Sequence, residues 1–247
     1  MPLSSTSEIS AVVLAGGFGT RVRHLLPGIP KPMAPVFGRP FLDWIIAFLR
    51  RGGIQSCVFS TGHLADVIAA YYASGQADGV HVECVREDNP LGTAGGFLHA
   101  ARSSSFFQQA KAWLVLNGDS LTVTSLTPLL DLANSPEVDG GLLAVPLADA
   151  SRFGTLEVDS DGWLKSFREK QPGSGLINAG VYLLKADQLK RAPTHRPLSF
   201  ETELFPELIN SGARLRVITC QAEFLDIGTP ETLHQAESFV SANASWF

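Results

Sequence analysis

The sequence predicts a mixed α/β domain in which a mainly parallel sheet is flanked by helices. Apolar runs of strand length alternate with helix-period segments through the first half of the 247-residue chain, which places successive strands in parallel with helices on both faces. After about residue 140 consecutive strands follow, which predicts a β-rich second half. Without an internal repeat or low-complexity linker, we expect a single domain over residues 1–247, with halves at about 9–140 and 141–240.

The first half follows this alternation element by element. Strands are expected at ISAVVLAGG (9–17), IQSCVFSTG (54–62), VHVECVRED (80–88) and AWLVLNGDS (112–120). Helices are expected at PFLDWIIAFLRRGG (40–53), ADVIAAYYASG (65–75) and TAGGFLHAARSS (93–104). Pro40 stands at the first turn of its helix and Gly52 at the end, which are the positions that favour these two residues.

The second half begins with strands at DGGLLAVPL (139–147) and GLINAGVYLLK (175–185). Between them, FGTLEVDSDGWLKSFREK (153–170) has two alternating runs around a turn at residues 159–162, which predicts a hairpin. Helices are expected at FETELFPELINSG (200–212) and PETLHQAESFV (230–240), with the strands ARLRVITC (213–220) and EFLDIG (223–228) between them.

Composition and charge limit the kinds of partner. The formal net charge of -5 argues against binding nucleic acid through the overall field, since phosphate neutralisation needs clustered Lys and Arg. The N-terminus lacks the pattern of a secretory signal and no eighteen apolar residues run together, so we expect no membrane partner. Cys57, Cys84 and Cys220 are odd in number and widely spaced, which favours reduced, buried thiols in a cytoplasmic protein.

A glycine-rich loop follows the first predicted strand. Gly16, Gly17 and Gly19 lie just beyond the carboxyl end of that strand, where open α/β sheets bind ligands. Glycines permit positive φ and let peptide N–H groups approach a ligand, and the Arg21 guanidinium suits phosphate oxygens. The loop taken alone is also compatible with a plain tight turn.

The residues after the loop exclude two common phosphate motifs. A P-loop needs Lys followed by Ser or Thr directly after its last glycine, whereas Gly19 is followed by Thr20 and Arg21. A dinucleotide fingerprint needs a helix running straight on, and the prolines of PGIPKP forbid it. We therefore expect a long, extended, proline-ordered loop in which Lys31 is a fixed charge suited to a reacting phosphate. The sequence does not specify the conformation of residues 22–29.

Two aspartates follow predicted strands. Asp119 in LVLNGDS and Asp226 in EFLDIGTPE each end a strand, and as carboxylates on one sheet they could share one Mg²⁺. Asp119 alone is equally compatible with a helix cap or a turn. A helix is expected to begin at Thr229-Pro230. The histidines lack metal-ligand spacing and no GxSxG elbow occurs, so covalent catalysis has no candidate.

Two polar features lie in the second half. FREKQP is compatible with sugar and phosphate binding by Glu169 and Lys170, or with a solvated charged turn. Asn178 lies in an otherwise apolar strand, where its side chain needs a partner. That partner is a ligand or a neighbouring backbone group.

Together, LAGGFGTRVR, PKPMAPV, NGDS, FREK, INAGVY and DIGTPE resemble, in order, the motifs of the sugar-phosphate nucleotidylyltransferases. Within that family the chain is most similar to the guanylyltransferases acting on D-glycero-α-D-manno-heptose 1-phosphate, through KPMAPVFGRPFLDW and EDNPLGTAGG. The resemblance implies a Rossmann-like, GT-A-like nucleotide-diphospho-sugar transferase fold whose first half binds nucleotide and whose β-rich lobe binds sugar phosphate. It also implies Mg²⁺, cytoplasmic location and a product for cell-surface polysaccharide, and leaves a homo-oligomer open.

The resemblance also assigns roles to residues. Catalysis would rest on Arg21, Lys31 and Asp119, and Asp119 with Asp226 would bind Mg²⁺. The sugar 1-phosphate would contact Gly154, Glu169, Lys170 and Asn178. The nucleoside triphosphate, with GTP favoured, would contact Leu14, Ala15, Gly16, Gly17, Gly19, Thr20, Arg21, Glu87, Gly92, Thr93 and Asp119.

Three alternatives stay open at this point. The substrates could instead be those of a mannose-1-phosphate guanylyltransferase or of a glucose-1-phosphate uridylyl- or thymidylyltransferase, because a few hydrogen bonds decide base specificity. A glycosyltransferase of similar architecture would release a nucleoside diphosphate instead of pyrophosphate. A non-catalytic nucleotide-sugar-binding regulatory subunit would keep the fold without the chemistry.

Overall fold

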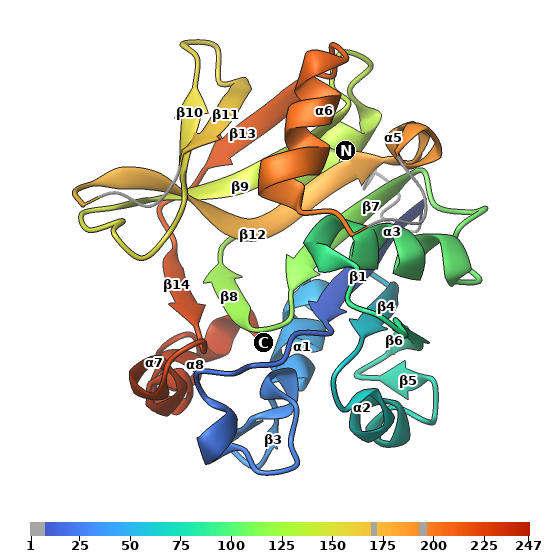
Figure 1. Cartoon of the computed structure of the whole chain (residues 1–247), viewed down its shortest axis with the longest axis vertical. Coiled ribbons are helices and arrows are strands. Elements are labelled where there is room, and N and C mark those ends of the chain that lie inside the picture. Colours follow the sequence, from blue (N-terminus) through green and yellow to red (C-terminus); the bar gives the residue numbers. More distant parts are fainter. Residues whose placement is uncertain (1–7, 169–171, 193–196) are drawn as a thin grey trace.

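A mixed ten-stranded sheet forms the centre of the part of the chain that the structure, a computed structural model, describes: residues 8–168, 172–192 and 197–247 (Figure 1). The strand order is β11-β10-β12-β7-β1-β4-β6-β5, and β9 pairs with both β12 and β13. The strands are β1 (Ile9–Ala15), β4 (Ser56–Thr61), β5 (Gln76–Ala77), β6 (Val80–Arg86), β7 (Ala112–Asn117), β9 (Gly140–Leu147), β10 (Thr155–Val158), β11 (Leu164–Arg168), β12 (Gly175–Lys185) and β13 (Leu215–Thr219).

The strands of the first half are parallel, as the alternation predicts. β1 lies between β7 and β4, and its Val12 is opposite Val115 on one side and Val58 on the other. β6 continues the parallel set beside β4, whereas β12 runs antiparallel to both β7 and β9. The predicted fold class, a mixed sheet flanked by helices, is confirmed. The carboxyl ends of β1, β4, β6 and β7 therefore meet at one edge, where ligands bind in such sheets.

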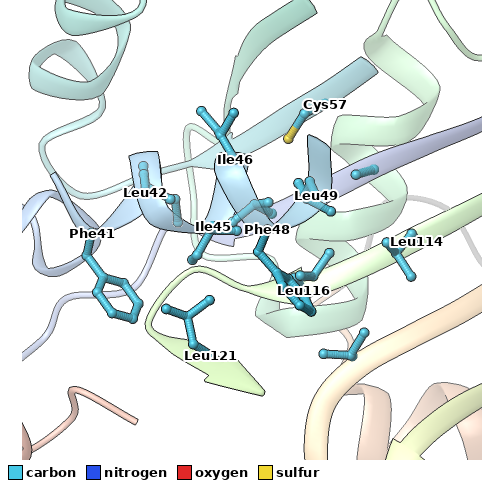
Figure 2. Packing of buried hydrophobic residues seen from close by; sticks show 14 of the residues in the cluster. Phe41, Leu42, Ile45, Ile46, Phe48, Leu49, Cys57, Leu114, Leu116 and Leu121 are labelled. Atoms are coloured by element: carbon cyan, nitrogen blue, oxygen red, sulfur yellow. The ribbon is translucent and has the colours of Figure 1, made fainter. Parts of the chain in front are cut away.

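Helices cover both faces of the sheet. Alternate residues of β1 point to opposite sides: Ala11 and Val13 join the cluster that contains α1 (Phe41–Arg51), and Val12 joins the cluster of α3 (Gly92–Ser103). Figure 2 shows α1 directing Phe48 toward Leu116 of β7. Each large apolar side chain buried in this way contributes about 1.5–3 kcal/mol, so the two clusters fix the sheet edge that carries the site. The helix α2 (Ala65–Tyr71) follows β4.

The β-rich second half contains the expected hairpin. β10 and β11 are antiparallel, and the Asp159 carboxylate accepts hydrogen bonds from the backbone N–H groups of Asp161 and Trp163 within the predicted turn. The two helical segments predicted at 200–212 and 230–240 are present, but each is divided into two helical pieces. Residues 200–210 form a π-helical turn, Phe200–Leu204, before α6 (Phe205–Asn210), because Pro206 cannot donate the i→i−4 bond. Residues 230–242 form two helices, α7 (Pro230–His234) and α8 (Ala236–Ala242).

A second, two-stranded sheet was not predicted. β8 (Ser120–Val123) and β14 (Glu223–Asp226) pair antiparallel, with Asp226 opposite Ser120. Shorter elements complete the chain: β2 (Pro35–Val36), β3 (Arg39–Pro40), α4 (Thr127–Leu130), α5 (Ala186–Arg191) and 3-10 turns at Arg23–Leu25, Lys31–Met33, Asp131–Asn134 and Ala244–Trp246. The loop after β1 is thus coiled into two 3-10 turns, so its predicted extended form was wrong. In the described ranges, no helix has the length and apolar character needed to cross a membrane.

All three cysteines are unpaired, as predicted. Cys57 is fully buried, whereas Cys84 and Cys220 are only half-buried. Burial raises the pKa of Cys84 to about 11 and raises that of Cys220 as well. These thiols therefore stay protonated near neutral pH and pack as small apolar groups.

Candidate active site

The glycine loop leaves β1 and turns back beside Lys31. Gly19 has a left-handed φ of 57°, and a Cβ atom there would lie 3.0 Å from the Cβ of Lys31. Glycine is therefore needed both for the turn and for the close approach of the lysine stem. Lys31 begins its 3-10 turn between Pro30 and Pro32, and its side chain is only 12% exposed. The predicted fixed charge lies against the loop.

A cavity of about 330 Å³ opens at this loop, and we call it the glycine-loop cavity. Most of the residues assigned to the nucleotide lie together on its wall, with contributions from β1, the β6–α3 connection and the end of β7. Its lining is Leu14, Gly16, Gly17, Phe18, Gly19, Lys31, Pro32, Ser60, Glu87, Pro90, Gly92, Thr93, Gly96, Asn117 and Asp119. Of the other residues assigned to the nucleotide, Ala15 is buried in the core and Thr20 is exposed.

Glu87 enters this cavity through a gap that three glycines leave. A Cβ atom on Gly16 would lie 2.5 Å, and one on Gly62 2.8 Å, from Oε1 of Glu87. One on Gly96 would lie 3.3 Å from Oε2, which accepts a hydrogen bond from Leu91 N–H at 3.2 Å. Burial raises the pKa of the Glu87 carboxyl above its ordinary value, and the Leu91 N–H and His99 oppose this rise. The carboxyl is thus held in place, although burial makes its charged form less favourable than it is in water.

The start of α3 is joined to the second half of the chain. Gly92 has a φ of 73°, and a Cβ atom there would lie 2.5 Å from the Leu198 carbonyl oxygen. That carbonyl accepts a hydrogen bond from Ala94 N–H at 2.9 Å, and Phe200 N–H donates to Thr93 Oγ1 at 3.1 Å. Hydrogen bonds therefore connect the wall of the glycine-loop cavity to the π-helical turn, Phe200–Leu204.

Lys31 and Asp119 meet in an ion pair between Nζ and Oδ2. Asp119 lies in the turn between β7 and β8, and its carbonyl accepts a hydrogen bond from Ile227 N–H at 2.9 Å. This bond brings the end of β14 to the same place. The structure therefore gathers the lysine and both predicted aspartates at the edge of the parallel sheet.

Asp226 reaches this place from a different sheet, so the expectation that both aspartates end strands of one sheet was wrong. Its Oδ1 accepts a hydrogen bond from Gly228 N–H at 2.6 Å. Burial, followed by the charge of Asp119, raises the pKa of Asp226, whereas the Gly228 N–H, Lys31 and Arg21 lower it. Two carboxylates that repel one another offer hard oxygen ligands to a cation.

The carboxylates of Asp119 and Asp226 fit Mg²⁺, provided that a substrate phosphate supplies further ligands. Within the described ranges, no cluster of three or more His, Cys, Asp or Glu side chains could hold a metal ion. Mg²⁺ typically binds one or two carboxylates together with substrate phosphates and water. The two carboxylates of Asp119 and Asp226 match that coordination preference. The remaining ligands would come from substrate phosphate and water, so Mg²⁺ would bind together with a phosphate.

A second cavity of about 900 Å³ lies against β12, and we call it the β12 cavity. It is lined by Arg21, Asn117, Ser120, Arg152, Phe153, Gly154, Lys165, Ser166, Phe167, Arg168, Asn178, Ala179, Glu201, Thr202, Pro206, Ile209, Asn210, Phe224 and Asp226. Gly154 and Asn178, assigned to the sugar phosphate, are among them. Arg21, assigned to the nucleotide, lies here as well. Glu169 and Lys170 lie outside the described residues.

Asn178 has protein partners for each of its polar atoms. Its Nδ2 donates to the Tyr182 hydroxyl at 2.8 Å and to Oε1 of Glu201 at 3.2 Å, and its Oδ1 accepts from Gly180 N–H at 3.0 Å. The partner that the sequence left open is thus a set of neighbouring groups. The side chain also lines the β12 cavity, so it is oriented before any ligand binds.

Sequence reasoning missed two residues. Asn117 ends β7 and lines both cavities, and its amide occupies the space that a Cβ atom on Gly180 would fill. Its position at the end of a buried strand, two residues before Asp119, is the sequence feature from which a role in the site could have been predicted. Glu201 lines the β12 cavity from the π-helical turn. No local signal indicated it, because its partners lie about twenty residues away in β12.

Chemically, the two cavities share Asn117 and meet where Lys31, Asp119 and Asp226 gather. Glycine backbone, cationic side chains and a pair of carboxylates suit a polyphosphate with its metal ion. No activated nucleophile is present among the described lining residues. The arrangement suits transfer between two bound substrates, without a covalent enzyme intermediate.

Comparison with known proteins agrees with this geometry. The chain is 35% identical over 230 residues to a mannose-1-phosphate guanylyltransferase of Mycobacterium tuberculosis, covering 92% of this chain and 63% of the length of that relative. It is 33% identical over 224 residues to a D-glycero-alpha-D-manno-heptose 1-phosphate guanylyltransferase of Campylobacter jejuni, covering 90% of this chain and 96% of that protein.

A solved structure has the same fold. The crystal structure of HddC from Yersinia pseudotuberculosis complexed with GMP-PN matches with a TM-score of 0.79 at 30% identity, covering 93% of this chain and 98% of that chain. The model of the family described as Nucleotidyl transferase matches residues 10–243, which include both cavities and the ion pair between Lys31 and Asp119. The chain therefore belongs to the nucleotidyl transferase family.

Proposed function

We propose that this protein transfers the guanylyl group of GTP to D-glycero-α-D-manno-heptose 1-phosphate, giving a GDP-heptose and pyrophosphate. One observation carries the proposal: the glycine-loop cavity and the β12 cavity share Asn117 beside the ion pair of Lys31 and Asp119. A nucleotide in the first and a sugar phosphate in the second would bring their phosphates together at these charges.

The reaction needs no general base. An oxygen of the sugar 1-phosphate, already anionic near neutral pH, attacks the α-phosphorus of GTP, and the bond to the bridging oxygen breaks as pyrophosphate leaves. Lys31 neutralises the charge that develops near the α-phosphate, and Arg21 meets phosphate oxygens from the side of the β12 cavity. Positioning and charge neutralisation then account for the catalysis.

Asp119 and Asp226 are the residues that would hold Mg²⁺. The ion, when bound, supplies charge neutralisation at the phosphate oxygens. Because Lys31 pairs with Asp119 in this structure, the lysine already provides a positive charge at that carboxylate. Its side chain then needs to turn to the phosphate when the nucleotide arrives.

Glu87 supports guanine as the base. Guanine presents two donors, N1–H and the N2 amino group, along one edge, and a carboxylate can accept from both. Uracil and thymine present one donor between two acceptors, which suits a carboxamide better. The three glycines around Glu87 and its bond to Leu91 hold the carboxylate on the cavity wall. The relatives named above as guanylyltransferases agree with this assignment.

Heptose is supported by relatives that match nearly end to end. The Campylobacter protein is named for this heptose 1-phosphate, and 96% of its length is covered. Mannose 1-phosphate is the second candidate, because the Mycobacterium relative is named for it and is slightly more identical. Both sugars share the manno configuration, so the β12 cavity would recognise the same ring hydroxyls. We further propose a cytoplasmic enzyme whose product supplies capsule, S-layer or lipopolysaccharide glycans.

One assay tests the proposal. Pyrophosphate release is measured for four nucleoside triphosphates against the 1-phosphates of heptose, mannose and glucose. The proposal requires kcat/KM to be highest for GTP with the heptose. A maximum at mannose corrects the sugar, and a maximum at UTP or dTTP overturns the base assignment. Binding without pyrophosphate release would indicate a regulatory subunit, and release of a nucleoside diphosphate would indicate a glycosyltransferase.

A further inference from the structure

Glu201 is carried into the β12 cavity by a turn of π-helix. In this turn Leu204 N–H donates to the Ser199 carbonyl five residues earlier, at 2.9 Å. π-helical turns are rare and occur frequently at functional sites. Phe200 anchors the turn, because its ring is fully buried and its N–H donates to Thr93. The backbone under Glu201 is therefore fixed on both sides.

Three donors hold the Glu201 carboxylate. Oε1 accepts from Asn178 Nδ2 and from the Tyr182 hydroxyl, each at 3.2 Å, and Oε2 accepts from Ser199 Oγ at 3.0 Å. Burial and the nearby Glu201 charge raise the pKa of Tyr182 well above its ordinary value, so its hydroxyl keeps the proton that it donates. A carboxylate accepts about four hydrogen bonds, so capacity remains for a further donor from the cavity.

The charges around the β12 cavity orient a sugar phosphate within it. Of its four cations, Arg168 is paired with Glu157 and Lys165 with Asp159 at 3.1 Å. A third, Arg152, lies 5.8 Å from the centre of the Phe153 ring, and its charge contributes to lowering the pKa of Glu231 on α7. Arg21 lies at the side of the cavity where Asp226 and Asp119 gather. A phosphate is attracted to Arg21 and repelled by a carboxylate, whereas sugar hydroxyls are donors that a carboxylate accepts. The hydroxyl end of the ligand therefore belongs at Glu201.

We propose that Glu201 is a specificity-determining residue of this site, whose carboxylate accepts hydrogen bonds from ring hydroxyls of the sugar 1-phosphate. Asn178 and Tyr182 act through it as positioning residues. The inference rests on the proposed function in one respect, since it takes the β12 cavity as the site of the sugar 1-phosphate. It adds a residue that lies outside the motifs on which the family resemblance was based.

The first test compares Glu201→Gln with wild type in steady-state kinetics. The variant keeps the shape of the side chain and loses its charge, so KM for the sugar 1-phosphate should rise about 10- to 100-fold. KM for GTP should stay within about twofold, because Glu201 does not line the glycine-loop cavity. Glu207→Gln, exposed on α6 outside both cavity linings, is the matched control and should change neither constant.

The second test identifies the contact through the substrate. Deoxy analogues of the sugar 1-phosphate are assayed with wild type and with Glu201→Gln. Wild type should lose about 10- to 100-fold in kcat/KM with the analogue that lacks the hydroxyl bound by Glu201. The variant should not distinguish that analogue from the parent sugar. Equal losses in both proteins for every analogue would overturn the inference.

Two further measurements separate the possible failures. All comparisons use the sugar 1-phosphate that wild type turns over fastest, so an error about heptose leaves the test of Glu201 intact. Wild-type turnover with an unchanged sugar KM in Glu201→Gln overturns this inference alone, whereas no turnover with any sugar overturns the proposed function as well. Should Glu201→Gln not fold, Tyr182→Phe removes one of the three donors and should still raise the sugar KM severalfold without affecting that for GTP.

Discussion

Lys31 Nζ forms an ion pair with the Asp119 carboxylate, although 88 positions of sequence separate the two residues. The glycine loop brings the lysine from the end of β1, and the β7–β8 turn brings the aspartate from the end of the neighbouring strand. The pair is half-buried, where a charge is expensive without a partner. The two groups therefore position one another at the junction of the cavities.

The first prediction concerns this pair. Lys31→Met and Asp119→Ala should each lower kcat at least about 100-fold, equivalent to about 2.7 kcal/mol of transition-state stabilisation. In a double-mutant cycle the combined loss should fall well short of the product of the two, because the residues act as a unit. Lys111→Met, which breaks the exposed ion pair with Glu8 far from the cavities, should leave kcat unchanged. Wild-type turnover in Asp119→Ala would contradict the proposed mechanism.

The second prediction concerns metal removal. EDTA should abolish pyrophosphate release, and added Mg²⁺ should restore it, because the two carboxylates need a cation to bind a triphosphate together. Asp226→Asn removes one of the two charges and should raise the Mg²⁺ concentration needed for half-maximal activity by about tenfold. Unchanged activity of wild type in EDTA would show that the aspartates bind no essential metal.

The third prediction concerns base specificity. Glu87→Gln replaces an acceptor-only carboxylate by an amide with one acceptor and one donor group, which complements uracil and thymine better than guanine. The ratio of kcat/KM for GTP over UTP should fall by about 10- to 100-fold. The sugar KM is the internal control, because Glu87 does not line the β12 cavity. An unchanged ratio would show that other groups read the base.

The fourth prediction uses the same carboxyl as a pH probe. Burial raises the pKa of Glu87, so the carboxylate that accepts from guanine is lost at a higher pH than an ordinary glutamate would be. KM for GTP should rise as the pH falls through this raised pKa, and Glu87→Gln should remove this dependence.

The contribution of Glu87 to the free energy of unfolding depends on pH in the opposite direction. Between its ordinary pKa and its raised native pKa, Glu87 binds more protons in the folded state than in the unfolded state, so its contribution to stability is lost as the pH rises through the native pKa.

The fifth prediction compares two neighbouring glycines. A Cβ atom on Gly16 would press on the Glu87 carboxylate at 2.5 Å, whereas one on Gly17 would meet no atom within 4 Å. Gly16→Ala should raise KM for GTP because it displaces the Glu87 carboxylate, and should lower the free energy of unfolding by about 1 kcal/mol, because the flexible end of that side chain can move aside. Gly17→Ala should change the free energy of unfolding by less than about 0.5 kcal/mol. Urea unfolding of both variants makes the comparison, and equal losses would mean that Gly16 has no special role in placing Glu87.

Much of the fold could be predicted because its signal is local. The alternation of apolar strands and helix-period segments defines the parallel set around β1, and the Gly-rich loop follows its end. β14 lies within the strand predicted at residues 223–228, but β8 has only four residues and was not predicted, and neither was its pairing with β14 across about a hundred residues of sequence. The form of the loop before Lys31 also escaped, since prolines restrict φ without choosing between extended and 3-10 backbone.

The site divides in the same way. Residues at strand ends, such as Asp119, could be assigned from position and motif. Arg21 could not be placed in a cavity, because the groups that lie near its guanidinium, Asp226 and Gly228, come about two hundred residues later in the chain. Glu201 could not be predicted as a site residue. In the sequence it is one polar position of an amphipathic helical pattern, and the partners that hold its carboxylate, Asn178 and Tyr182, belong to β12. Long-range contacts decide these assignments.

The hydrogen bond from Phe200 to Thr93 has a thermodynamic consequence. Thr93 lines the glycine-loop cavity, and Glu201, which follows Phe200 in the chain, lines the β12 cavity. A single hydrogen bond therefore connects the walls of the two proposed substrate sites. Linkage requires any effect that one bound substrate has on the affinity for the other through this bond to be equal in both directions.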